Sequence, residues 1–360
     1  MNKKISIHDI AKHLNVSATT VSFVLNGKAE ERKISSAMKK KIQIYVKEIG
    51  YHPNLIAQSL RTGKTKIIGM LVEDISDPFF SSIARIIEEN LYKLGYKIFH
   101  SSTNNNTERA KAILQIFRER QVDGYIIAPA PGIEDDIQEL IDDSKPVILF
   151  DRYFPGLETT NIVVDNFVGA YESVQHLVHN GFTNIGFVTL QSKQVQMMDR
   201  LSGYLKSIKE NKFPKYIHRV IYKTAPAEII VLIKNFLLKN KEIDALFFAT
   251  NYLAISGLQA IRELGLKVPD DIGIVGFDDN THFSLFSPSI TAAAQPVEEI
   301  SNQTVKELNK ALIMEDQNEK KKTIVLKTNL IVRESSVPHI NYKKEQIKEF
   351  TFENHRSKKN

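Results

Sequence analysis

The sequence has 360 residues and contains neither cysteine nor tryptophan. The lack of cysteine excludes disulfides, thiolate metal sites and cysteine nucleophiles. No run of about 18 apolar residues occurs, so we expect no membrane-spanning helix and no membrane partner. The first 20 residues carry Lys, His and Asp among their apolar residues and do not form an export signal. We therefore expect the protein to be cytoplasmic.

The remaining composition is ordinary, with 42% hydrophobic and 25% charged residues, and the length allows two or three domains. The net charge of +6 is unevenly distributed. Residues 1–66 carry 13 Lys and Arg against 4 Asp and Glu, a net charge of +9; residues 67–339 carry 29 against 35, a net charge of −6; and residues 340–360 carry 6 against 3, a net charge of +3. The basic first segment predicts contact with phosphate groups.

This basic segment has the pattern of three short helices. Apolar residues recur at helical spacing from Ile7 to Leu14, behind a capping box of Ser6 and Asp9. A three-residue turn leads to a second helix that Ser17 caps and Gly27 ends, and a third helix starts near Ser35. Two helices this short and this close together indicate a helix-turn-helix.

The outward face of the second helix is expected to enter a DNA major groove. Its members are Ala18, Thr19, Ser22, Phe23 and Asn26. The alternative is a plain surface helix of a small bundle, which the surrounding positive charge disfavours. A short segment follows in which Asn54 could cap a helix that runs to Arg61, and its apolar residues need a partner. The alternative there is a simple linker.

From Lys66 onward, short apolar runs alternate with helical patterns, which is typical of parallel α/β structure. The alternation begins again after Asp165, so two α/β lobes are expected. Ligands bind beyond the carboxyl ends of parallel strands, and the loops there are rich in polar residues. These loops are 74–80, 101–106, 151–152, 198–200, 250–251 and 278–279. If the lobes face each other, the loops converge on one cleft.

Several motifs resemble the lactose-repressor/galactose-repressor (LacI/GalR) family of transcriptional regulators. They are the segment 16–27 (VSATTVSFVLNG), the segment 50–54 (GYHPN) and the segment 56–60 (IAQSL). The resemblance covers the chain to about Ser336. It implies an all-α helix-turn-helix headpiece followed by a periplasmic-binding-protein-like domain of two parallel-sheet lobes, acting as a repressor that binds a pseudo-palindromic operator as a homodimer.

The family resemblance implies that the segment after the headpiece becomes a hinge helix on operator DNA. Leu60 of each subunit would wedge into the minor groove, with Ala57 beside it. The residues expected to contact DNA are Ser6, Ser17, Ala18, Thr19, Thr20, Ser22, Phe23, Asn26, Tyr51, Asn54, Ala57 and Leu60. Phe23 departs from the Arg or Lys that the family often carries, and it favours contact with a thymine methyl group over a guanine.

The resemblance also places a small-molecule effector between the lobes. The residues carried over are Phe79, Asp151, Arg200, Asn251 and Asp278. Such charged and amide groups suit the hydroxyl groups of a sugar or sugar derivative, with a purine as the less favoured ligand. Tyr252 is a departure from the family pattern at this point and leaves the ligand type open. With no tryptophan, the candidates for stacking on a ring are Phe79, Tyr153 and Tyr252.

We expect four segments along the chain. They are the headpiece (1–52), the hinge helix and linker (53–65), the two-lobed effector and dimerisation domain (66–339) and a basic tail (340–360). The resemblance divides the large domain into an N-lobe of about 66–163 and 295–326 and a C-lobe of about 164–294 and 327–339. A hinge between lobes could close on a ligand.

The sequence contains no P-loop, no Gly-x-Gly-x-x-Gly, no His-Glu-x-x-His and no Gly-x-Ser-x-Gly, which are motifs of common enzyme classes. His176 and His179 could be proposed as metal ligands, but both fall in a helix among apolar residues with no third ligand nearby. We therefore expect no enzymatic activity, metal or cofactor. The other candidate function is a carbohydrate-binding receptor without DNA activity, against which the basic headpiece argues.

Overall fold

The computed structural model describes residues 5–51, 63–313 and 321–338. The chain divides into two compact units between Thr65 and Lys66. The predicted DNA contacts Asn54, Ala57 and Leu60 lie outside the described residues, as does the predicted basic tail.

The first unit holds the three predicted helices. They are α1 (Ile7–Leu14), α2 (Ala18–Leu25) and α3 (Ser36–Glu48). Ser6 and Asp9 form the expected capping box, with the Ser6 N–H donating to Asp9 Oδ2 at 2.8 Å. Ser17 Oγ accepts from the Thr20 N–H at 3.0 Å at the start of α2. The polar residues before each helix therefore set the helix boundaries.

The three helices share one small core. Its buried members are Ile10, Ala11, Leu14, Val21, Val24, Ala29 and Ile42. Asn15 adopts a left-handed conformation (φ 54°) that ends α1 and turns the chain into α2. The helix-turn-helix that the spacing predicts is confirmed.

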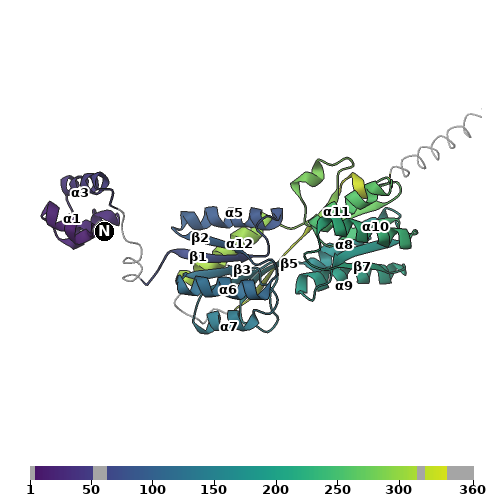
Figure 1. Ribbon diagram of the computed structural model, residues 1–360, viewed down its shortest axis with the longest axis horizontal. Helices are drawn as coiled ribbons and strands as arrows, with labels where there is room; N and C mark the ends of the chain where they lie inside the picture. Colours follow the sequence, from purple (N-terminus) through teal and green to yellow (C-terminus); the bar gives the residue numbers. More distant parts are fainter. Residues whose placement is uncertain (1–4, 52–62, 314–320, 339–360) are drawn as a thin grey trace, which may run out of the picture. The chain divides into compact units, whose positions relative to one another are not determined.

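The second unit begins with a parallel six-stranded sheet in the order β11-β5-β4-β3-β1-β2 (Figure 1). Its strands are β1 (Ile67–Val72), β2 (Lys97–Ser102), β3 (Gly124–Ile127), β4 (Val147–Phe150), β5 (Thr160–Val164) and β11 (Thr323–Leu326). Its helices are α5 (Pro78–Lys93), α6 (Thr107–Glu119), α7 (Glu134–Asp142) and α12 (Val297–Ile313). Helices α5 and α12 pack together on one face of this N-lobe sheet.

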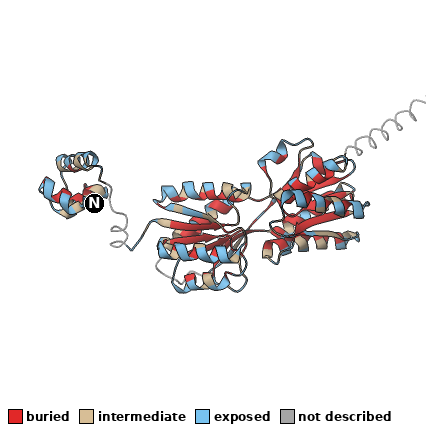
Figure 2. Ribbon diagram, viewed as in Figure 1, coloured by how far each residue is buried: buried red, intermediate tan, exposed pale blue. Residues whose placement is uncertain are grey.

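The C-lobe repeats the arrangement with the order β12-β10-β9-β8-β6-β7, in which only β12 is antiparallel to its neighbour. Its strands are β6 (Ile185–Leu190), β7 (Tyr216–Val220), β8 (Ala245–Phe248), β9 (Gly273–Phe277), β10 (Thr291–Ala294) and β12 (Asn329–Ile331). Its helices are α8 (Asn166–His179), α9 (Val195–Asn211), α10 (Pro226–Lys239) and α11 (Asn251–Glu263), with short 3-10 turns η1 (Thr281–Ser284) and η2 (Glu334–Ser336). Figure 2 shows the central strands of both sheets buried beneath helices that are exposed on their outer faces. The predicted fold of a helical headpiece and two α/β lobes is confirmed.

The chain passes between the two sheets three times, after β5, after β10 and between β11 and β12. Every central strand therefore ends near this crossing region, where polar loops can meet. Among the described residues, no helix is both long enough and apolar enough to cross a membrane.

Candidate functional site

The predicted reading face of α2 is at the surface of the headpiece. Thr19 and Asn26 are exposed, and Ala18, Ser22 and Phe23 are partly buried. Several of its polar atoms already have partners: Asn26 Nδ2 donates to the Ser22 carbonyl at 2.7 Å. The face that remains is small and largely apolar.

The other predicted DNA contacts of the headpiece have structural partners. Ser6 and Ser17 are exposed caps of α1 and α2, and the hydroxyl groups of Ser17 and Thr20 lie 2.8 Å apart. Tyr51 is half-buried and packs against the headpiece core. Ser6 and Ser17 stand at the N-terminal ends of α1 and α2, and helix N-termini are places where phosphates can bind.

In the two-lobed unit, Asp151 and Asp278 occupy equivalent places in the two lobes. Each follows the last residue of a buried strand, β4 and β9 respectively, and each has a left-handed backbone (φ 65° and 69°). Non-glycine residues seldom adopt this conformation, and they cluster at functional sites when they do. At both positions, an aspartate that directly follows a buried strand therefore also has a left-handed backbone.

Arg200 is held rigidly inside the C-lobe, where only 2% of it is exposed. Its Nε donates to Asn166 Oδ1 at 2.9 Å, and its Nη1 donates to the Ala249 carbonyl at 2.6 Å and to Asp278 Oδ2 at 3.3 Å. The guanidinium also lies 3.6 Å from the centre of the Phe277 ring. Its contacts hold the carboxylate of Asp278 in place.

All five predicted effector residues line one small cavity between the lobes. Phe79, Asp151, Arg200, Asn251 and Asp278 surround it together with Tyr252. Its volume is about 40 Å³, room for a few water molecules but not for a sugar ring. The structure therefore brings the predicted residues together but leaves little space between them.

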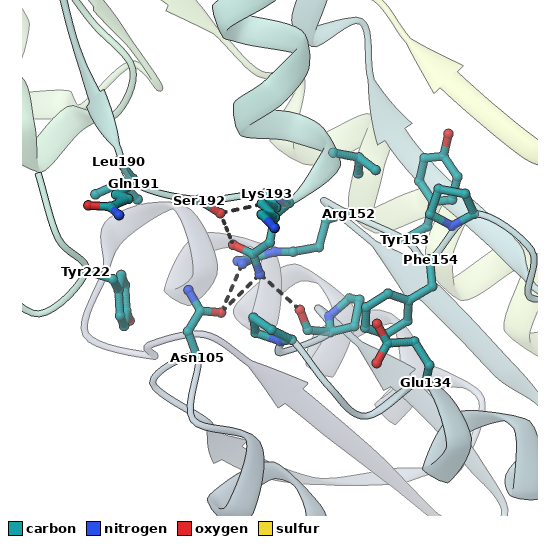
Figure 3. Close-up of a pocket in the computed structure, with 15 residues that line it drawn as sticks. Asn105, Glu134, Arg152, Tyr153, Phe154, Leu190, Gln191, Ser192, Lys193 and Tyr222 are labelled. Carbon is teal, nitrogen blue, oxygen red and sulfur yellow. Dashed lines mark hydrogen bonds between the residues drawn. The ribbon is translucent and has the colours of Figure 1, made fainter. Parts of the chain in front are cut away.

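A neighbouring cavity of about 440 Å³ provides the room that the first one lacks. Arg152 lines both cavities, and the larger one contains none of the five predicted residues. Figure 3 shows Tyr222 on one side of it and Tyr153 and Phe154 on the other, with Arg152 and Asn105 between them. Of these aromatic residues only Tyr153 was a predicted stacking candidate; Tyr222 follows β7 and carries the same strand-end signal as the predicted loops.

Arg152 links three polar groups around the two cavities. Its Nε donates to Asp151 Oδ2 at 2.9 Å, Nη1 donates to Asn105 Oδ1 at 3.0 Å, and Nη2 pairs with the carboxylate of Glu73. Burial lowers the pKa of Arg152, but the two carboxylates outweigh it and raise that pKa. The sequence indicates the Asp151-Arg152 loop but not Glu73, because nothing in the sequence links the two segments.

The small cavity is rich in carboxylates. Burial raises the pKa of Asp77, which caps α5, to about 6, and it also raises the pKa of Asp151. Four acidic residues but only two basic ones line this cavity, which gives a formal net charge of −2. They are Glu73, Asp77, Asp151 and Asp278 against Arg152 and Arg200.

The two histidines considered as metal ligands have other partners. His176 Nε2 lies 2.7 Å from Ser336 Oγ, and His179 Nδ1 lies 2.6 Å from the Gln175 carbonyl. Within the described ranges no group of three or more His, Cys, Asp or Glu side chains is placed to hold a metal ion.

Comparison with known proteins places both units in a known family. The family described as "Bacterial regulatory proteins, lacI family" matches residues 6–54, and a periplasmic binding protein-like domain matches residues 174–336. The chain is 33% identical to the HTH-type transcriptional regulator RegA of Clostridium saccharobutylicum, over 92% of this chain and 99% of RegA. It is 30% identical to the ribose operon repressor of Haemophilus influenzae, over 92% of this chain and 98% of the repressor. The fold resembles that of the lac repressor dimer solved with operator and the anti-inducer ONPF, with a TM-score of 0.81 and 23% identity over 93% of this chain and 100% of the other.

Proposed function

The chain belongs to the lacI family of bacterial regulatory proteins. From this we propose that it is a repressor that binds a pseudo-palindromic operator as a homodimer. We propose that it responds to a sugar bound between its lobes. Its relatives are named as transcriptional regulators, and we propose no enzymatic activity. We place its action in the cytoplasm, where operator DNA is found.

The observation that carries this proposal is the headpiece. A capped α2 presents a small, accessible face, and the first 66 residues have a net charge of +9. A short helix fits the major groove, and the lysines and arginines around it can neutralise phosphates. We propose that Ala18, Thr19 and Phe23 meet base edges.

Selection of binding sites from random DNA with the full chain tests the proposal. We expect one inverted-repeat motif to be enriched, with binding that weakens steeply as salt rises. Selection of no motif, with equal binding to every sequence, would reject the regulator function and favour a receptor without DNA activity.

Exposed apolar side chains on both lobes are candidates for a homodimer interface. Tyr92 at the end of α5 is 75% exposed, Leu285 after η1 is 78% exposed, and Phe99 and Phe286 are also exposed. Large apolar side chains at a surface mark protein interfaces when they are grouped. The lac repressor, which has the same fold, is described as a dimer, and two-fold symmetry in a protein suits an inverted-repeat site.

We propose that the effector is a sugar that spans both interlobe cavities. Its hydroxyl groups would meet Asp151, Arg152 and Asp278 in the small cavity, and an apolar ring face would stack between Tyr222 and Tyr153 in the larger one. The small cavity must widen to admit a ligand, so binding would be coupled to movement of the lobes.

The formal charge of −2 in the small cavity narrows the ligand class. A phosphate or carboxylate there would add negative charge to a site where burial already raises the pKa of two aspartates. We therefore favour neutral sugars over sugar phosphates, and Gln196 supports this choice. Its Oε1 is buried at this cavity without a hydrogen-bond partner and can accept from a ligand hydroxyl.

Thermal unfolding of the full chain with neutral sugars and with the phosphate esters of the same sugars tests the ligand class. We expect stabilisation by a neutral sugar, and its loss in Tyr222→Ala with operator affinity unchanged. Glu228→Gln, an exposed carboxylate of α10 that lines neither cavity, serves as the control. Stabilisation by phosphate esters alone would contradict the proposed ligand class.

A further inference from the structure

We propose that Arg32, which lies outside the recognition helix, reads a guanine in the major groove and that the ring of Phe23 holds it in position. This inference rests on the proposed DNA-binding function of the headpiece. It adds a residue of the loop between α2 and α3 to the reading surface.

The recognition helix itself offers few free polar groups. Asn26 Nδ2 donates to the Ser22 carbonyl and lies 3.2 Å from Ser22 Oγ, so these two side chains bind each other. Thr20 is tied to Ser17 in the cap. The hydroxyl of Thr19 and the apolar surfaces of Ala18 and Phe23 remain. Such a face can contact thymine methyl groups but has no side chain that donates two hydrogen bonds to a guanine.

Arg32 can donate the two hydrogen bonds to a guanine that the recognition helix cannot. Its guanidinium carbon lies 5.0 Å from the centre of the Phe23 ring, a cation-π distance. A guanidinium presents five N–H donors in a fixed fork that fits guanine O6 and N7. In the part of the headpiece that the structure describes, Lys39 pairs with Glu30 at 3.0 Å, whereas Arg32 forms no ion pair. Its donors are therefore available for DNA.

The loop that carries Arg32 is anchored to the headpiece core. The Arg32 N–H donates to the Lys28 carbonyl at 3.1 Å, and the Ile34 N–H donates to the Ala29 carbonyl at 2.8 Å. Ala29 is a buried core residue, 1% exposed. This anchoring fixes the start of the Arg32 side chain, and the Phe23 ring directs its far end toward the face of α2. The cost of ordering a long side chain on binding is thereby reduced.

Loss of a guanine contact and loss of a phosphate contact should affect DNA binding differently. A base contact specifies sequence, whereas a phosphate contact adds the same affinity to every sequence. Lys28 is an exposed cation of the same loop for which no aromatic contact is seen, and it provides the matched control. Arg32→Lys keeps the charge but loses the fork, so it separates the two kinds of contact.

The test is selection of half-sites from a randomised library with the full chain, followed by affinity measurements on the selected operator. We expect Arg32→Ala and Arg32→Lys to lose a guanine preference at one symmetric position and to weaken binding to that operator about 5- to 150-fold, the range for one bidentate base contact. Lys28→Ala should weaken binding to all sequences alike and lower the salt dependence by about one phosphate contact.

Phe23→Leu tests the positioning role. We expect it to relax the same guanine position, and the double variant with Arg32→Ala to lose no further discrimination there. Unchanged selection by Arg32→Ala, or a uniform loss that Arg32→Lys restores, would overturn the proposal. Failure of the unaltered chain to select any DNA would instead reject the regulator function, so the two failures are distinguishable.

Discussion

Arg200 is a predicted ligand contact and also a buried residue that holds the C-lobe together. We expect the loss of its buried contacts to determine most of the effect of replacing it. Its guanidinium is buried among Asn166, the Ala249 carbonyl and Asp278. Removing one partner of a buried ion pair typically costs about 3 to 5 kcal/mol because the other charge is left uncompensated.

We therefore expect Arg200→Ala to lower the unfolding temperature of the two-lobed unit by more than about 6 °C. Calorimetry of the full chain measures this, and Arg262→Ala, which removes a surface arginine from α11, is the control. An unchanged unfolding temperature would show that Arg200 is not structural. Loss of ligand response in Arg200→Ala is by itself weak evidence for a ligand contact.

Asp77 is expected to make the stability of the two-lobed unit depend on pH. Burial raises the pKa of Asp77 from 3.8 to about 6, so its ionised form is less stable in the folded state than in the unfolded chain. The stability that the protonated group provides is present below pH 4 and is lost as the pH rises through about 6. Asp77→Asn removes this loss and can still cap α5.

We expect Asp77→Asn to increase the free energy of unfolding by about 1 to 2 kcal/mol at pH 8 and to change it little at pH 4. Denaturant unfolding at both pH values measures the difference. Glu89→Gln, an exposed carboxylate of the same helix, should have a small effect at both. Equal effects of Asp77→Asn at the two pH values would contradict the buried-carboxylate explanation.

At the scale of elements, helices α8 and α9 approach each other at Gly203. A Cβ atom on this residue would lie 2.3 Å from the Phe167 carbonyl oxygen and 2.9 Å from the Tyr171 nitrogen. Both are backbone atoms, which cannot move aside as a flexible side chain can. The absence of a side chain at Gly203 therefore permits the close packing of α8 on α9, the helix that carries Arg200.

Gly203→Ala should separate these helices and destabilise the C-lobe by about 1 to 3 kcal/mol, despite the higher helix propensity of alanine. Thermal unfolding measures the change. Ser202→Ala on the exposed side of α9 is the matched control and should unfold close to the unaltered chain. A Gly203→Ala variant as stable as this control would show that the helices can adjust.

The sequence was sufficient for the elements with strong periodicity or caps. The Ser6, Ser17 and Ser35 caps fixed the headpiece helices, and apolar runs such as 67–72 and 245–249 located central strands to within a few residues. The strands β11 and β5 pair in parallel although they are far apart in the chain, and short edge strands such as β12 carry no distinctive local pattern.

The candidate site was predictable only where a local signal existed. Asp151, Asn251 and Asp278 directly follow strands, so the parallel topology brings them together. The partnership of Arg152 with Glu73 depends on three-dimensional packing between separate loops, and the sequence has no periodicity that reveals it. Cavity size is also a product of packing, which explains why the larger cavity was not foreseen.

At the scale of the whole molecule, charge separates the two functions. The positive charge is concentrated in the first 66 residues, whereas residues 67–339 carry a net charge of −6. The electrostatic attraction to DNA phosphates therefore comes from the headpiece, because the two-lobed unit has a net negative charge. One headpiece has a small reading surface, and the proposed homodimer would double that surface on an inverted-repeat site.

The proposed homodimer predicts how operator geometry controls affinity. Sedimentation should show a particle of twice the 40.9 kDa chain mass, and the selected operator should contain two inverted half-sites. Insertion of five base pairs between them turns one half-site by about half a helical turn, so the two headpieces can no longer bind together. We expect affinity to fall to about the level of nonspecific DNA in a gel-shift titration, while the same five base pairs outside the half-sites change little. Equal affinity for a single half-site and the complete operator would contradict the dimer, because each headpiece would then bind alone.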